Sequence, residues 1–122
     1  MIWGRCGRNW ALAIGRAVYG DNHPSVARKL NNLGRAWKAL GERQKAVGYY
    51  EQALAIDRAV YGDGHPSVAR ELNNLGAVYF ALGKKQKAKK YFQSAHAIFS
   101  QFFGPEHFNT IAVALWLAAC DE

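Results

Sequence analysis

Cysteine is scarce in this sequence. Its two cysteines, Cys6 and Cys120, lie near opposite ends and form no Cys-x-x-Cys pair. Small disulfide scaffolds need several cysteines, and structural zinc sites need cysteines or histidines at short spacing. We therefore expect no disulfide framework and no metal, and we infer two free thiols in a reducing, cytoplasmic compartment.

Long apolar runs are also missing. The longest run covers the ten residues of the segment 111–120, whereas a transmembrane helix needs about 20. Glycines and polar residues interrupt the apolar stretch of residues 1–17, so this segment does not resemble a secretory signal. We expect no membrane partner.

Acidic residues are few. The 16 lysines and arginines outnumber the 9 aspartates and glutamates, which gives a formal net charge of +7. Such a charge favours acidic partners of any kind. The carboxylates are scattered, and the sequence contains neither a nucleophile–base arrangement nor a glycine-rich phosphate-binding motif. We predict a protein that is not an enzyme and that uses no cofactor.

Internal repetition is what the sequence has in abundance. Residues 11–52 and 53–94 align without a gap, and 28 of their 42 positions are identical. A third, partial copy begins at residue 95. Self-similarity at a fixed period of this length predicts a repeat architecture, in which stacked units complete the core together.

Each unit predicts two helices, which we call helix A and helix B. In the first helix A, apolar residues recur at spacings of four, three, four and three, as one helical stripe: Val26, Leu30, Leu33, Trp37 and Leu40. Prolines suit the first turn of a helix and glycines suit the residue after its end. These residues place the boundaries at Pro24, Pro66, Gly41, Gly62, Gly83 and Gly104.

Leucine, glycine, alanine and aromatic residues follow one order in both copies. They are Leu30, Leu33, Gly34, Trp37, Ala46, Tyr50 and Ala53, then Leu72, Leu75, Gly76, Tyr79, Ala88, Phe92 and Ala95. This pattern resembles the tetratricopeptide repeat, and the 42-residue period resembles the variant found in kinesin light chains. The resemblance implies an all-α, right-handed α-solenoid of antiparallel helix pairs that acts as a protein-binding scaffold.

The units define one array of about six helices. We expect a partial repeat with a helix B in residues 1–20, full helix pairs in 21–62 and 63–104, and a partial repeat with a helix A in 105–122. The small residues of each pair, such as Gly34 and Ala53, are expected where two helix axes approach closely.

The face of helix A opposite the apolar stripe is the candidate binding site. At about 100° per residue, this face carries Arg28, Asn31, Arg35 and Lys38 in one unit and Arg70, Asn73, Ala77 and Phe80 in the next. Arginine pairs well with carboxylates, and an asparagine amide offers a donor and an acceptor to a peptide backbone. We predict that successive A helices form a groove for a short, acidic peptide. Asn32 and Asn74 are expected to bond within the stack instead.

Three histidines recur at the 42-residue period, at His23, His65 and His107. No pair of them has the short spacing of zinc ligands. Because the same helix junction recurs at each, we predict a structural role in the turn rather than a metal site.

Two further functions stay open. The first is self-association through the terminal helices, where apolar residues lack a covering helix: Trp3, Trp10, Ile111, Leu115 and Trp116. The second is weak, charge-driven binding of nucleic acid by the lysine-rich segment 84–90. This segment lacks interleaved aromatic residues, so a solvated helix face is favoured there.

Overall fold

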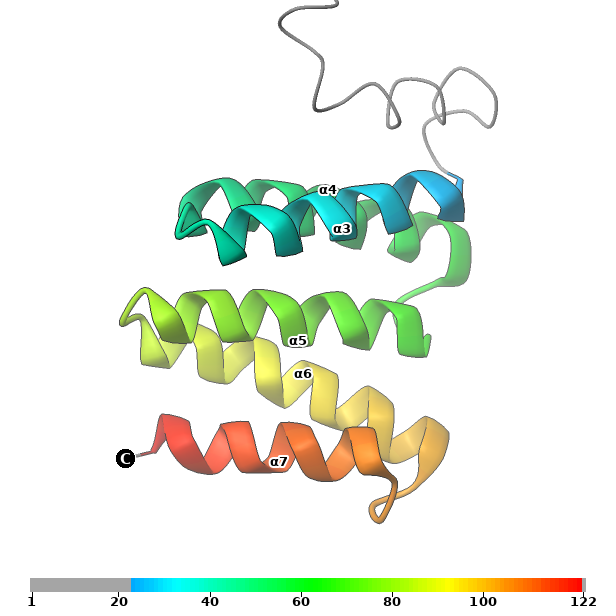
Figure 1. Cartoon of the computed structure of the whole chain (residues 1–122). Coiled ribbons are helices and arrows are strands. Elements are labelled where there is room, and N and C mark those ends of the chain that lie inside the picture. The colour runs from blue at the N-terminus through cyan, green and yellow to red at the C-terminus, as the bar shows by residue number, and fades with distance from the viewer. Residues whose placement is uncertain (1–22, 122) are drawn as a thin grey trace, which may run out of the picture.

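The computed structural model describes residues 23–121, and this part of the chain consists of helices joined by short loops (Figure 1). The helices are α3 (Pro24–Ala39), α4 (Arg43–Tyr61), α5 (Pro66–Ala81), α6 (Lys85–Phe103) and α7 (Phe108–Cys120). The predicted A and B helices of both full units are therefore present, as is the terminal helix A. The helix expected in residues 1–20 lies outside the described residues.

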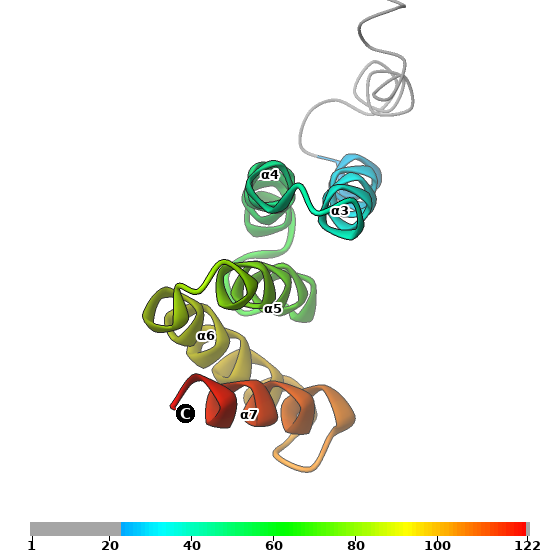
Figure 2. The same ribbon diagram turned by 60° about the vertical axis from the view of Figure 1, so that its left-hand side comes forward.

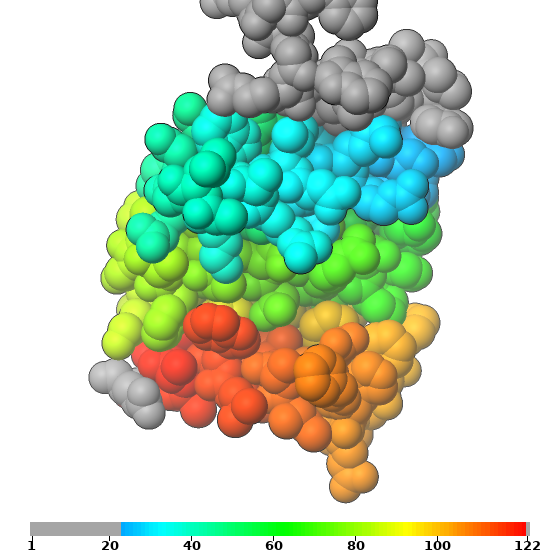
Figure 3. All heavy atoms as spheres, in the orientation of Figure 1, coloured from blue at the N-terminus to red at the C-terminus, as the bar shows by residue number. Residues whose placement is uncertain are grey.

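The helices are arranged in two layers. In a view that looks nearly along α3 and α4, the helices α3, α5 and α7 form one layer and α4 and α6 form the other (Figure 2). Each helix packs against the next one along the chain. The result is the predicted α-solenoid, with the A helices side by side on one face (Figure 3). None of the helices within residues 23–121 has both the length and the apolar character needed to cross a membrane.

The recurring histidines begin the A helices. The Nδ1 atoms of His23 and His65 each accept a hydrogen bond of 3.0 Å from the backbone N–H two residues later. His107 does the same at 3.1 Å. A side-chain acceptor at this position satisfies one of the N–H groups that a helix start leaves unpaired. The predicted structural role of these histidines is confirmed.

The small residues allow the two layers to approach closely. A Cβ atom on Gly34 would lie 2.7 Å from Cε1 of Tyr50, and one on Gly76 would lie 2.7 Å from Cε1 of Phe92. Both rings are almost completely buried, with 2% and 0% of their surface exposed. Glycine is therefore required at these two positions by space, as the sequence pattern predicted.

The predicted apolar stripe of the first helix A is buried only in part. Val26 and Leu30 are fully buried, and Leu33 and Trp37 are partly buried. Leu40, which we expected in the core, is 73% exposed. It is the residue after the last helical residue, Ala39, whereas its counterpart Leu82, at the same place after α5, packs against the main core.

Candidate functional site

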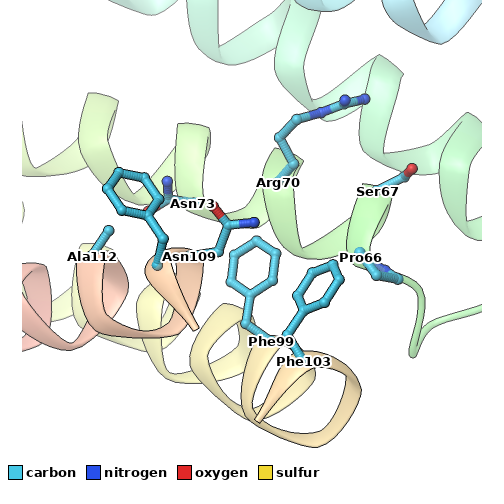
Figure 4. A pocket seen from close by; sticks show the side chains of 9 residues that line it. Pro66, Ser67, Arg70, Asn73, Phe99, Phe103, Asn109 and Ala112 are labelled. Carbon is cyan, nitrogen blue, oxygen red and sulfur yellow. The ribbon is translucent and has the colours of Figure 1, made fainter. Parts of the chain in front are cut away.

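The surface formed by the A helices contains a pocket between α5 and α7, with the end of α6 as its floor (Figure 4). It encloses about 330 Å³. Four lining residues come from α5, two from α6 and three from α7. They are Pro66, Ser67, Arg70, Asn73, Phe99, Phe103, Phe108, Asn109 and Ala112, and we call this site the groove pocket.

Two of the predicted binding residues, Arg70 and Asn73, lie together in the groove pocket. The Oδ1 atom of Asn73 is buried and has no hydrogen-bond partner among the described residues. An orphaned buried acceptor is costly unless a ligand or a water supplies the missing donor. Asn73 is therefore the residue of the groove pocket whose acceptor stays unsatisfied among the described residues.

The corresponding asparagine of the first unit, Asn31, has a hydrogen-bond partner for its Oδ1 atom. Asn74 donates a 2.8 Å hydrogen bond from Nδ2 to Oδ1 of Asn31, which links α5 to α3. Asn31 is only 7% exposed, so this amide serves the packing of successive A helices. The expectation that Asn74 bonds within the stack is confirmed, while Asn32 is exposed on α3.

The repeat explains the difference between Asn31 and Asn73. The partner of Asn31 lies 43 residues further along the chain, and the same step from Asn73 leads to Trp116. Trp116 does not repeat the hydrogen bond of Asn74, because Oδ1 of Asn73 has no partner among the described residues. The ring of Trp116 instead stacks on Phe92 with centroids 5.3 Å apart.

Two acidic residues, Asp57 of α4 and Glu71 of α5, are buried. Glu71 is fully buried and Asp57 is 2% exposed. The guanidinium of Arg70 lies 3.6 Å from Oε2 of Glu71. Burial raises the pKa of Glu71 to about 7, because desolvation and the nearby Asp57 together outweigh the attraction of Arg70. Burial also raises the pKa of Asp57.

This pair was missed in the sequence, although a signal was present. Asp57 and Glu71 occupy two of the positions at which the copies differ, where the first unit has Gly15 and Lys29. A simultaneous change of two positions to acidic residues indicates a special interface, but periodicity alone does not show that the two side chains meet.

The remaining predicted groove residues are spread along the A-helix surface. Arg28, Arg35 and Lys38 are exposed on α3, where they keep this end of the surface cationic. Ala77 and Phe80 are partly buried against the main core. The edge of Phe80 contacts Trp116 at a centroid distance of 5.4 Å.

The aromatic wall of the groove pocket was also missed. The rings of Phe99 and Phe103 lie close to one another beneath Pro66 and Asn109 (Figure 4). Phe108 is 79% exposed at the rim. Four phenylalanines within ten positions, Phe99, Phe102, Phe103 and Phe108, at the junction of two helices, were the available signal. The arrangement combines an apolar wall with a cation and an amide acceptor, and such a combination suits a peptide side chain and its backbone.

The residues predicted for self-association fall into two groups. On α7, Ile111 is 47% exposed and Leu115 is 68% exposed, whereas Trp116 is packed against α5 and α6. Trp3 and Trp10 lie outside the described residues. Within residues 23–121, no group of three or more histidine, cysteine or acidic side chains is placed to hold a metal ion.

Comparison with known protein families gives a match along most of the chain. A profile described as "Tetratricopeptide repeat" matches residues 11–59, 37–101 and 72–122. No curated protein matches the sequence.

Several solved structures share the fold. One is BtubC (BKLC) from P. vanneervenii, with a TM-score of 0.85 and 26% identity over 97% of this chain. Another is a Podosopora anserina protein of the kinesin light chain type, with nearly identical TPR-like repeats. It has a TM-score of 0.81 and 30% identity over 89% of this chain, and a single-residue variant of it gives the same values. The chain spans about half of each, namely 49% of BtubC and 52% of the Podosopora protein.

Proposed function

The chain belongs to the tetratricopeptide repeat family, in its kinesin-light-chain-like form, and from this premise we propose that it binds a short acidic peptide segment in the groove of its A helices. Repeats of this family mediate protein–protein interactions, which makes a protein partner the expected ligand. A non-catalytic scaffold in the cytoplasm is part of the same proposal.

The observation that carries the proposal is that Arg70 and Asn73 both line the groove pocket. The half-exposed guanidinium supplies a fork of N–H donors that matches a carboxylate. The unpartnered Oδ1 of Asn73 supplies an acceptor for a peptide N–H group. Phe99, Phe103 and Phe108 provide apolar contact beside these two polar groups.

A displayed-peptide screen tests the proposal. The wild type and the Asn73→Ala variant would be screened in parallel, and enriched peptides would then be measured by fluorescence anisotropy. We expect acidic peptides, including acidic peptides with an aromatic residue, to be enriched on the wild type. Loss of one hydrogen bond should weaken them by about fivefold to tenfold in Asn73→Ala.

Asn32→Ala is the matched control, because Asn32 is an exposed asparagine on the preceding helix A. It makes the same chemical change outside the groove pocket and should leave affinity unchanged. Arg70→Gln should weaken acidic peptides more than neutral ones. Equal affinity of the wild type and Asn73→Ala, or no enrichment at all, would remove the groove pocket as the site.

Self-association through α7 is a second candidate function, favoured by the exposure of Ile111 and Leu115. The molecular mass determined by light scattering at about 100 µM should then exceed that of the monomer. The Leu115→Lys variant should have the mass of the monomer. A monomeric wild type at this concentration contradicts the candidate.

A further inference from the structure

A second pocket lies in the other layer, between α4 and α6, with a leucine of α5 at its floor. It encloses about 450 Å³. Its lining consists of three cations, three neutral polar side chains and the leucine. They are Arg58, Lys87, Lys90, Gln86, Tyr91, Ser94 and Leu72, and we call this site the basic pocket.

The lining of the basic pocket is rich in donors and contains no carboxylate. Lys87 is held over the ring of Tyr79, with its Nζ atom 4.5 Å from the centroid. Arg58 already contacts an oxyanion at the pocket's edge, because its Nε atom lies 3.3 Å from Oδ1 of Asp63. Both partners of that ion pair are well exposed, at 47% and 88%, so the pair can exchange with a ligand at little cost.

The equivalent pocket of the preceding unit shows which lining residues of the basic pocket recur with the repeat. An equivalent pocket of about 340 Å³ lies one repeat earlier and is lined by Trp37, Lys45, Gly48, Tyr49 and Gln52. Lys87 and Tyr91 of the basic pocket correspond there to Lys45 and Tyr49. Lys90 corresponds to Gly48, so the repeat fold does not need this cation.

We propose that the basic pocket binds a dianionic phosphate monoester, with Arg58, Lys87 and Lys90 as its charged donors. A phosphate monoester carries a charge close to −2 above its second pKa of about 6 and presents three acceptor oxygens. Three cations that line one pocket therefore match it better than they match a carboxylate, which has one charge. The monoester can be free in solution or carried by a phosphorylated side chain.

Nucleic acid is a poorer match for the same residues. Each phosphodiester carries a single charge, and binding to it is built from a long cationic track rather than one pocket. The basic pocket concentrates its cations around one volume, and its aromatic residues do not form a row of exposed stacking surfaces.

The proposal is tested by titrating the isotopically labelled full chain with inorganic phosphate at pH 7.5 and constant ionic strength, monitored by two-dimensional NMR. Shifts should concentrate at the backbone amides of residues 86–94 and at Arg58. Lys90→Gln should weaken binding by about fivefold to tenfold, as expected for loss of one charged donor. Lys85→Gln is the control, because Lys85 is on the same helix but does not line the pocket.

A second variant is expected to raise the affinity for phosphate, and a control with the same change of net charge accompanies it. Asp63→Asn removes the carboxylate that competes for Arg58 and should strengthen phosphate binding. Glu106→Gln changes the net charge equally but lies in the exposed loop after α6, so it should have little effect. A phosphoserine peptide and its serine counterpart then distinguish free phosphate from a phosphorylated side chain as the ligand.

Three outcomes overturn the proposal. The first is the absence of saturable phosphate binding by the wild type. The second is equal weakening by Lys90→Gln and Lys85→Gln, because binding would then follow net charge alone. The third is a wild-type affinity for single-stranded DNA, per phosphate, that matches the affinity for phosphate and is insensitive to Lys90→Gln.

Discussion

Asp57 of α4 and Glu71 of α5 are both buried, and burial together with the negative charge of Asp57 raises the pKa of Glu71. Asp57 Oδ2 and Glu71 Oε2 are both buried and have no donor among the described residues. The nearest cation, Arg70, is 3.6 Å from Glu71, which is longer than a good hydrogen bond. Protonation of Glu71 removes one of two buried negative charges, so the interface is most stable when the pair carries one negative charge.

This relationship predicts that stability falls as pH rises. The pKa of Glu71 is raised from 4.5 to about 7 in the folded chain. The folded state therefore binds more protons than the unfolded state between these values, and the free energy of unfolding decreases with pH across that window. The full shift corresponds to at most roughly 3 kcal/mol. Urea unfolding at pH 4.5 to 8 measures it.

The variant Glu71→Gln isolates the contribution of this carboxyl group. Its amide can donate to Asp57 without a titrating proton, so we expect it to be more stable than the wild type at pH 8, by about 1 to 3 kcal/mol. Its stability should also change less between pH 5 and 8. Glu106→Gln, on an exposed loop, should keep the wild-type profile. An unchanged profile in Glu71→Gln contradicts the assignment.

The close contact at Gly76 predicts a position-specific cost for one methyl group. Gly76→Ala should reduce the free energy of unfolding by about 1 to 3 kcal/mol, because a Cβ atom would overlap the buried ring of Phe92. Gly48→Ala adds the same group to a helix where nothing lies within 4 Å, and it should stabilise the chain by about 0.5 to 1 kcal/mol. Chemical denaturation of both variants gives the comparison, and equal effects would contradict it.

The histidine at the start of α5 predicts a capping effect. His65→Ala removes the acceptor for the Ser67 N–H group and should cost about 1 kcal/mol. His65→Asn keeps an acceptor at the cap and should recover most of this loss. The ring of His65 also stacks on Tyr61, with centroids 4.1 Å apart, so a remaining deficit in His65→Asn measures the stacking. Thermal unfolding followed by circular dichroism is sufficient.

The hydrogen bond between the side-chain amides of Asn74 and Asn31 joins successive A helices. It predicts that alanine substitution changes stability by different amounts at two equivalent positions of the repeat. Asn74→Ala leaves Oδ1 of buried Asn31 without its 2.8 Å donor and should cost about 1 to 3 kcal/mol. Asn32→Ala is the same substitution one repeat earlier, at an exposed position, and should change stability by less than about 0.5 kcal/mol. If both variants unfold at the same denaturant concentration, the bond contributes nothing.

The sequence predicted the helices because their signals are local and repeated. Pro66 and Gly83 bound α5, and the spacing of small and aromatic residues predicted the contact between Gly76 and Phe92. Leu40 was placed wrongly, because a periodic pattern carries no information on where the buried face of a helix ends.

The site was less predictable, because it depends on where the repeat is interrupted. Helical angles placed Asn31 and Asn73 on equivalent faces. Only the structure shows that Asn31 accepts a hydrogen bond from Asn74, whereas Oδ1 of Asn73, which faces the repeat that contains Trp116, has no partner among the described residues. The two phenylalanines at the end of α6 line the pocket because α7 follows at a particular angle, and neither composition nor spacing specifies that angle.

The acidic pair between α4 and α5 has a consequence for longer assemblies built from this unit. In tandem copies of residues 53–94, each new junction would contain one aspartate from a helix B and one glutamate from the following helix A. Because the stability of such arrays is close to a sum over neighbouring units, the pH slope would grow in proportion to the number of copies. Array length would then set how steeply stability falls between about pH 4.5 and 7, and replacing the glutamate by glutamine at chosen junctions would determine which segment of the array opens first.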